Sequence, residues 1–371
     1  MTDASIRAQY ERWCEKAIEC PLDELEAFED DEVSLADAFG RNLGFGTGGM
    51  RGKLGSGPNR MNVYTVARAT QGLANYLNER FEAPTVAIAR DTRINGEQLE
   101  RAAASVLAAN GIPSFLFQRH QPTPVLSFAV RDLGCSAGIC ITAGHNSAEY
   151  NGFKVYDSHG CQIAAQSARD IEAAIDRLDV FDDVKRSDFF DAVDNGSVSW
   201  VRELLLDRYI DTIAKRRFKE PGADAVPISL VYTPLNGTGT ECFSRIAKRI
   251  GVDAVRVVAE QADPDGHFPT CPTPDPEQTS ALSHGLELAA RTSPDLLLAS
   301  DPPAGRIGVA APRSGGFFEI ISGNDLGILL LDYICHMRAM QGENLRDGVV
   351  ITTIVSSAMV DVLATHYGCE L

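Results

Sequence analysis

The sequence predicts an α/β protein made of consecutive units with mixed or mostly parallel sheets. Short apolar, strand-like runs alternate with helix-like segments, and short links join them. The alternation restarts twice, without any short-period repeat. At roughly 100–200 residues per domain, 371 residues provide for two or three domains. A composition with 44% hydrophobic and 23% charged residues is that of ordinary globular material.

Three cycles of strands and helices follow one another after a helix-like N-terminal segment. The strands expected in the first two cycles are residues 85–90, 114–117, 137–142, 152–156, 228–232, 254–258 and 296–300. The helices expected there are residues 95–110, 239–250 and 278–291. A third cycle is expected as a helix at 325–340, a strand at 349–352 and a helix at 356–367. Buried apolar runs of this length between turn residues are typical of parallel strands.

Two connections are interpreted as domain boundaries. Residues 179–198 are rich in charge, and residues 311–316 are rich in proline and glycine. We therefore expect units at 1–200, 201–315 and 316–371. The last unit is too short to close a sheet of the same kind, so it is expected to be an incomplete domain.

Charge and cysteine content limit the partners and the compartment. A formal net charge of −17 argues against a nucleic-acid partner, because phosphate backbones require clustered basic residues. It does not argue against a phosphorylated metabolite, which a few local cations can bind. The N-terminal residues do not resemble a signal peptide, and no apolar run approaches the ~18 residues of a membrane span. Nine scattered cysteines favour reduced thiols in the cytoplasm.

Three segments concentrate residues suited to chemistry. FGTGGMRG at 45–52 is a glycine-rich loop in which Arg51 is suited to binding a phosphate, although a plain turn is equally compatible with it. TAGHNS at 142–147 follows a buried strand and leads to Lys154. Loops after such strands are the usual ligand sites, and a histidine beside asparagines and a lysine is less easily structural than a histidine alone. DPPAGR at 301–306 taken alone indicates a β-turn.

These segments together resemble the α-D-phosphohexomutases, the family of phosphoglucomutase and phosphomannomutase. The family has a phosphate-contacting arginine in a similar glycine-rich loop, a phosphoserine loop of the form TASHNP followed by YNGFK, and a metal loop of the form DxDxDR. QPTPVLSF at 121–128, YTPLNGTG at 232–239 and SGNDLG at 322–327 also look like family segments in family order. The resemblance covers nearly the whole chain.

The resemblance implies a reaction and a set of roles. A phosphoserine passes its phosphoryl group to a hexose monophosphate, and the other phosphate of the resulting hexose 1,6-bisphosphate returns to the serine. Magnesium held by three aspartates stabilises the charge in transfer. By position, Arg51 would contact the phosphoserine phosphate, and His145 and Lys154 would assist beside the nucleophile. Asp301 would be the first metal ligand, and Arg306 would follow the metal loop.

Departures from the family pattern gather at the catalytic centre. The nucleophile position is Gly144, which has no side chain to phosphorylate, and the other two metal positions are Pro303 and Gly305. Ser147 replaces the usual proline, and Asn236 replaces a usual histidine. The family's sugar-specificity segment and its fourth, phosphate-clamping domain are expected to lie beyond residue 371. Magnesium is therefore expected to bind weakly or not at all, and the fourth domain is expected to be absent.

Several alternatives stay open at this point. The chain is interpreted as a phosphohexomutase that has lost or nearly lost catalysis, or as a non-catalytic sugar-phosphate-binding or partner-binding pseudoenzyme. A structural remnant is a third and weaker interpretation. Rescue of the reaction by the hydroxyl of Ser147 or Thr142 is disfavoured, because reacting atoms must come within roughly 3–3.5 Å. Hexose phosphates are the expected ligands, whereas the sequence does not indicate which hexose is preferred or what the oligomeric state is.

Overall fold

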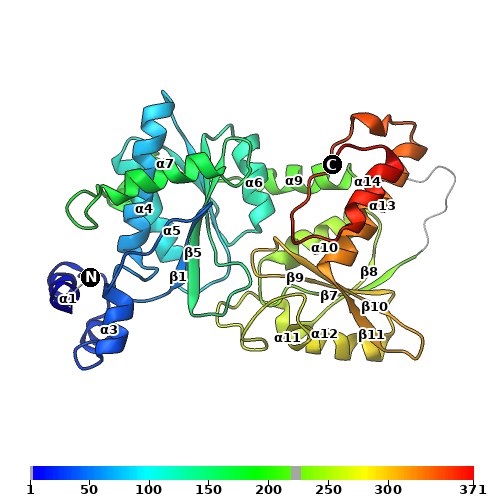
Figure 1. Ribbon diagram of the computed structural model, residues 1–371, viewed down its shortest axis with the longest axis horizontal. Coiled ribbons are helices and arrows are strands. Elements are labelled where there is room, and N and C mark those ends of the chain that lie inside the picture. The colour runs from blue at the N-terminus through cyan, green and yellow to red at the C-terminus, as the bar shows by residue number, and fades with distance from the viewer. Residues whose placement is uncertain (1–2, 219–226) are drawn as a thin grey trace.

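The computed structural model describes residues 3–218 and 227–371, which form two sheet-containing units and a C-terminal pair of helices (Figure 1). The elements of the first unit are α1 (Asp3–Lys16), α2 (Leu22–Glu26), α3 (Glu32–Phe39), β1 (Gly49–Lys53), α4 (Val63–Arg80), β2 (Val86–Arg90), α5 (Gly96–Ala109), β3 (Ser114–Leu116), α6 (Thr123–Asp132), β4 (Ala137–Ile141), β5 (Tyr150–Asp157), α7 (Ala165–Asp176), α8 (Phe189–Asp194) and β6 (Val198–Trp200).

The remaining elements form the second unit and the C-terminal helices. They are α9 (Leu204–Ala214), β7 (Ser229–Thr233), α10 (Gly239–Arg249), β8 (Ala254–Val257), α11 (Ala259–Ala262), α12 (Thr279–Thr292), β9 (Leu296–Ser300), β10 (Ile307–Pro312), β11 (Phe318–Ile321), α13 (Gly323–Met340), the 3-10 helix η1 (Leu345–Asp347) and α14 (Met359–Tyr367). Within the described residues, no helix is long and apolar enough to cross a membrane.

The first sheet is mixed, with the strand order β1-β5-β4-β2-β3-β6. Strands β4, β2, β3 and β6 are parallel, whereas β5 runs antiparallel to both β4 and β1. Alternation along β2 separates the two faces: Val86 and Ile88 join the core that contains α4 and α5, and Ala87 and Ala89 join the core that contains α6. Burial on both faces explains why this strand is apolar throughout.

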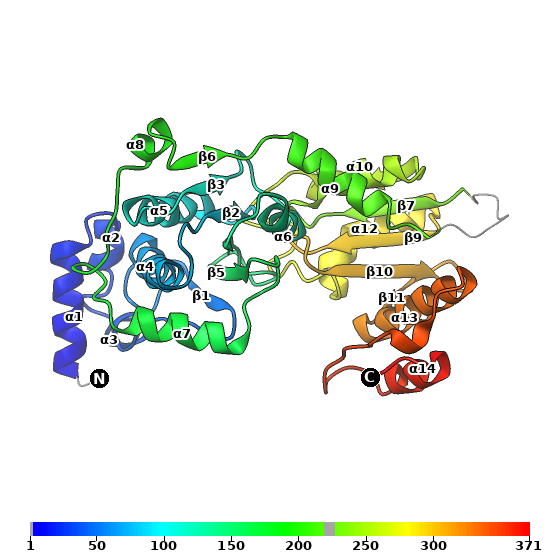
Figure 2. The same ribbon diagram turned by 90° about the horizontal axis from the view of Figure 1, so that it is seen from above.

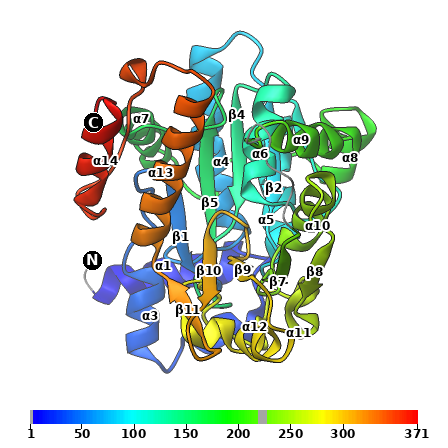
Figure 3. The ribbon, with the colours of Figure 1, turned by 90° about the vertical axis from the view of Figure 1, so that its right-hand side faces the viewer.

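The second sheet has the order β11-β10-β9-β7-β8, in which β9, β7 and β8 are parallel and β10 and β11 return antiparallel. Figure 3 shows β10, β9, β7 and β8 side by side, with α10 and α12 beside them. Val231, Leu297 and Ala310 form the centre of its core. Both sheets confirm the predicted α/β class.

Helix α9 joins the two units, and Figure 2 shows it close to α6 and α10. Arg208 of α9 pairs with Asp132, and Arg245 of α10 pairs with Asp207. The units also meet near the strand ends, where the Thr123 N–H donates to the Pro303 carbonyl at 2.8 Å. The loop after β9 therefore contacts the start of α6 across the junction.

Two expectations for the C-terminal part need correction. The predicted strand at 349–352 does not form: Val349 makes only an isolated bridge to Glu370, because no neighbouring strand is present in the described residues to complete a ladder. Residues 311–316, interpreted as a domain boundary, instead include the end of β10 and the turn to β11, so the second sheet continues to Ile321.

Candidate active site

The loop that follows β4 contains Gly144, the position aligned with the family nucleophile. Gly144 has φ +63°, in the left-handed region that glycine adopts without steric cost. A Cβ built on this residue would meet no other atom within 4 Å, and the Gly144 N–H donates to Thr142 Oγ1 at 3.0 Å. A side chain at position 144 would therefore project into open space from a strained backbone conformation.

Arg93 stabilises the conformation of this loop through its side chain. Its buried guanidinium donates four hydrogen bonds to main-chain carbonyls of the loop, those of Gly144 (2.7 Å), Asn146 (2.5 Å), Ser147 (2.8 Å) and Tyr150 (2.8 Å). Three of these carbonyls lie in the turn between β4 and β5, and the fourth belongs to Tyr150, the first residue of β5.

Asp91 binds both Arg93 and the hydroxyl of Thr142. Its Oδ1 accepts from the Arg93 N–H at 3.0 Å, and its Oδ2 accepts from Thr142 Oγ1 at 2.5 Å and lies 3.4 Å from Arg93 Nε. Thr142 is fully buried in this arrangement. Its hydroxyl has a structural role, which supports the expectation that it does not replace the missing serine.

Cations from several elements surround the loop. Arg51 lies on β1 and donates from Nη1 to Asn146 Oδ1 at 3.0 Å. Lys154 lies on β5, between Gly49 of β1 and Cys140 of β4. The antiparallel pairing of β1, β5 and β4 therefore places a glycine-rich segment and the 142–150 loop beside one another, although they are about a hundred positions apart in the chain.

Charged residues of both units shift the pKa of His145. Burial lowers that pKa, and the positive charges of Arg306 and Arg51 lower it further, while Asp275 and Asp301 oppose the shift. Residues of the second unit therefore lie within electrostatic reach of His145. Among the residues carried over from the family pattern, Arg51, Asp301 and Arg306 act on His145, and Lys154 and Arg306 act on Asp301.

The loop after β9 turns its carboxylate inward. Asp301 Oδ1 accepts from the N–H groups of Gly305 (2.8 Å) and Arg306 (2.9 Å), and the Asp301 carbonyl accepts from Ala304 N–H. Burial raises the pKa of Asp301, and these two donors oppose the rise. Pro303 offers no side-chain donor atom, and in the described ranges no cluster of three histidine, cysteine, aspartate or glutamate residues is arranged around a metal position.

Two residues that replace family positions have structural partners. Asn236 is buried at φ +56°, donates from Nδ2 to the Asp263 carbonyl at 3.0 Å and accepts from Thr270 Oγ1 at 3.2 Å. Ser147 Oγ lies 3.4 Å from Glu149 Oε1. Asn236 therefore shapes the second unit's loop.

The second unit also contacts Arg93 directly. The guanidinium carbon of Arg93 lies 5.1 Å from the ring centroid of Phe268. The Arg93 backbone forms an isolated β-bridge with Gly266. A Cβ on Gly266 would lie 2.5 Å from the Thr92 carbonyl oxygen, so only glycine allows this approach. Sequence reasoning missed Asp91 and Arg93, although both follow a buried strand at the sheet edge where the 142–147 loop also begins.

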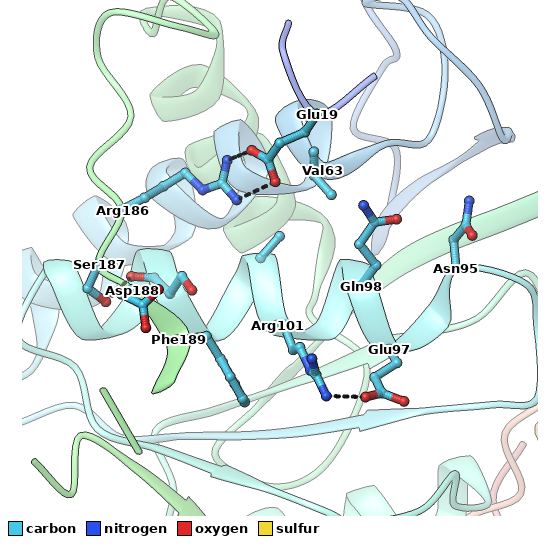
Figure 4. Close-up of a pocket in the computed structure, with 12 residues that line it drawn as sticks. Glu19, Val63, Asn95, Glu97, Gln98, Arg101, Arg186, Ser187, Asp188 and Phe189 are labelled. Atoms are coloured by element: carbon cyan, nitrogen blue, oxygen red, sulfur yellow. Dashed lines mark hydrogen bonds and ion pairs between the residues drawn. The ribbon is translucent and has the colours of Figure 1, made fainter. Parts of the chain in front are cut away.

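A separate cavity of about 560 Å³ lies along α5, away from these residues (Figure 4). Its two arginines are neutralised, Arg186 by Glu19 and Arg101 by Glu97. None of the residues carried over from the family pattern lines this cavity.

Comparisons with known proteins agree with this geometry. The model of phosphoglucomutase/phosphomannomutase α/β/α domain I matches residues 42–180, and the model of domain II of the same family matches residues 207–315. The phosphoglucomutase of Staphylococcus saprophyticus is 32% identical over 362 residues, covering 97% of this chain and 64% of the relative. A phosphoglucomutase of Staphylococcus aureus is 32% identical over 363 residues, covering 97% and 63%.

Solved structures share the fold at lower identity. A protein of Thermus thermophilus described as a phosphomannomutase superposes with a TM-score of 0.69 at 24% identity, covering 89% of this chain and 68% of that one. A phosphoglucomutase/phosphomannomutase family protein of Burkholderia thailandensis has a TM-score of 0.69 at 21% identity, covering 88% and 64%.

The two family models together span more than half of the chain, and two α/β units with a shared site at their junction agree with them. The chain belongs to the phosphoglucomutase/phosphomannomutase family, the α-D-phosphohexomutases, as the resemblance predicted. It spans less than two thirds of the length of the curated relatives named above.

Proposed function

We propose that this chain is a phosphohexomutase-family protein whose phosphoryl transfer between hexose 1-phosphate and hexose 6-phosphate is impaired. The observation that carries this proposal is Gly144, which occupies the nucleophile position without any oxygen to phosphorylate. Thr142 does not replace it, because its hydroxyl donates to the buried Asp91. Of the three units expected at 1–200, 201–315 and 316–371, we propose to keep the number but to move the second boundary beyond Ile321, because β11 belongs to the second sheet.

Magnesium is the cofactor that the family resemblance implies, and the residues of this chain do not fit it. Magnesium requires near-octahedral oxygen coordination, normally through carboxylates and water. Asp301 is the single carboxylate of the loop, and two N–H groups of that loop already occupy its Oδ1. We therefore propose that Mg²⁺ binds weakly or not at all. Titration calorimetry should show no saturable Mg²⁺ binding in the unaltered chain; a saturable signal that disappears in Asp301→Asn would contradict this proposal.

A second candidate, a non-catalytic binder of sugar phosphates, is favoured by the retained cations Arg51, Lys154 and Arg306. These residues suit the recognition of an anion whether or not transfer follows. Hexose 1-phosphates, hexose 6-phosphates and the 1,6-bisphosphate are the proposed ligands. We also propose a cytoplasmic location, which nine free cysteines support.

Two assays distinguish these candidates. A coupled assay that follows the conversion of glucose 1-phosphate to glucose 6-phosphate should show no turnover above a mock preparation from a mutase-deficient host. Thermal unfolding with each sugar phosphate should show stabilisation if the chain binds its ligand without turnover. Turnover at ordinary enzyme rates would contradict the proposal, and absence of both turnover and stabilisation would contradict the binder.

A further inference from the structure

The cations at the junction lack the carboxylate partners that other arginines of this acidic protein have. Within residues 3–218 and 227–371, neither Arg51, Lys154 nor Arg306 has a carboxylate oxygen within the 4.0 Å of an ion pair. The contrast with the cavity along α5 is direct, because both arginines there pair with glutamates (Figure 4). A protein with a net charge of −17 thus keeps a local group of cations that form no direct ion pair within the described residues.

The space in front of these cations is open at one position. Apart from the adjoining residues 143 and 145, no atom lies within 4 Å of a Cβ built on Gly144. The only hydrogen bond of the Arg51 side chain in the described structure goes to the neutral Asn146 amide. Carboxylates do face the site, but Asp301 directs Oδ1 to its own loop, and Asp275 Oδ1 accepts from the Glu277 N–H. The cations therefore remain available to a ligand.

We propose that a free phosphate dianion binds beside Gly144 as a separate ligand, at a position that the phosphate of a sugar can also occupy. This inference rests on the proposed function, since it assumes that position 144 is never phosphorylated. Arginine and lysine donate charge-assisted hydrogen bonds to phosphate oxygens, and the planar guanidinium of Arg51 is suited to a bidentate contact. The exposed position of Arg51 and Arg306 leaves the anion a path from solvent.

The matched variants Gly144→Asp and Gly144→Asn test this proposal. Aspartate and asparagine have nearly the same shape, and both tolerate the left-handed conformation better than other side chains do. Only aspartate brings a negative charge to the cations. Thermal unfolding of the full chain is measured against inorganic phosphate at constant ionic strength, because screening would otherwise change with phosphate.

Inorganic phosphate should stabilise the unaltered chain in a saturable way, and it should also stabilise Gly144→Asn. It should no longer stabilise Gly144→Asp, whose own carboxylate occupies the site. Arg51→Gln should weaken phosphate binding roughly tenfold or more, the value expected for a lost charge-assisted hydrogen bond. Arg313→Gln removes an exposed arginine that pairs with Glu319 and should leave binding unchanged.

The inference is overturned if phosphate does not stabilise the unaltered chain, or if it stabilises Gly144→Asp and Gly144→Asn equally. Adding glucose 1-phosphate and inorganic phosphate together identifies the source of the anion. Competition shows that the sugar's phosphate takes the same place, whereas additive stabilisation shows that free phosphate is a second ligand. If glucose 1-phosphate binds but inorganic phosphate does not, the inference fails and the binding function stands. If the coupled assay shows turnover, the proposed function fails independently.

Discussion

Replacing Arg93 with methionine tests whether one buried cation holds the loop at Gly144. Methionine keeps a long unbranched side chain but removes the charge and all the donors. Arg93→Met therefore removes the guanidinium donor from four main-chain carbonyls and leaves the buried carboxylate of Asp91 without its cation. The free energy of unfolding should fall substantially, although neither residue was identified from the family pattern.

The expected loss is about 3–5 kcal/mol, the range for breaking a buried ion pair by removing one partner. The four carbonyls contribute less than a full hydrogen-bond energy each, because Gly144, Asn146 and Ser147 are only partly buried and water replaces some of the lost donors. At roughly 2–4 °C per kcal/mol for units of this size, the melting temperature should fall by roughly 6–20 °C.

Urea unfolding of four chains measures this coupling: the unaltered protein, Arg93→Met, Asp91→Asn and the double variant. In the double variant no charge is left uncompensated, so it should be more stable than the sum of the single losses predicts. Arg313→Met, which removes an exposed ion pair with Glu319, should change stability by less than about 1 kcal/mol. A loss below about 1 kcal/mol for Arg93→Met, or strict additivity, would refute the reasoning.

Two further substitutions have expected outcomes. Gly144→Ser should fold but lose about 1–2 kcal/mol in urea unfolding, because the site has room for a side chain while φ stays at +63°; an equal loss in Gly144→Ala would confirm a backbone cause. Glu100 is buried, and burial raises its pKa from 4.5 to about 8. Stability should therefore fall as pH rises from about 4.5 to 8, by up to about 1.4 kcal/mol per pH unit, and Glu100→Gln should flatten this slope in unfolding at pH 5, 6.5 and 8. An unchanged slope in Glu100→Gln would refute the assignment of this pH dependence to Glu100.

Much of the fold was predictable because most of the strands are continuous apolar runs. Residues 85–90 and 296–300 were expected as strands and form β2 and β9. β1 was missed, since its sequence GMRGK contains two glycines and its pairing with β5 depends on residues a hundred positions away. The strand expected at 349–352 was wrong for the converse reason: its sequence suits a strand, but a strand also needs a hydrogen-bonded neighbour.

The candidate site was predictable to the extent that family motifs mark it. Arg51, His145 and Lys154 do converge, because β1, β5 and β4 are neighbours in the sheet. Asp91 and Arg93 were missed because their roles are contacts with main-chain carbonyls and a buried hydroxyl, which motif comparison does not reveal. The available signal was topological: β2 and β4 are parallel neighbours, so the residues after both strands meet at one edge.

The combined variant Gly144→Ser, Pro303→Asp and Gly305→Asp tests whether catalysis was lost at only a few positions. A Cβ on Gly305 would lie 4.0 Å from Asp301 Oδ1, so an aspartate at 305 places a second carboxylate beside the first. Magnesium should then raise the melting temperature of the combined variant but not that of Gly144→Ser alone, because clustered carboxylates repel until a cation neutralises them.

The same variants test phosphoryl transfer. After incubation with glucose 1,6-bisphosphate, intact mass should show phosphoserine forming at least about 10²-fold faster in the combined variant than in Gly144→Ser alone, because the loss of one charge-stabilising group typically costs that factor in rate. If Gly144→Ser alone accepts the phosphoryl group as fast as the combined variant, the aspartate positions are not what limits this site.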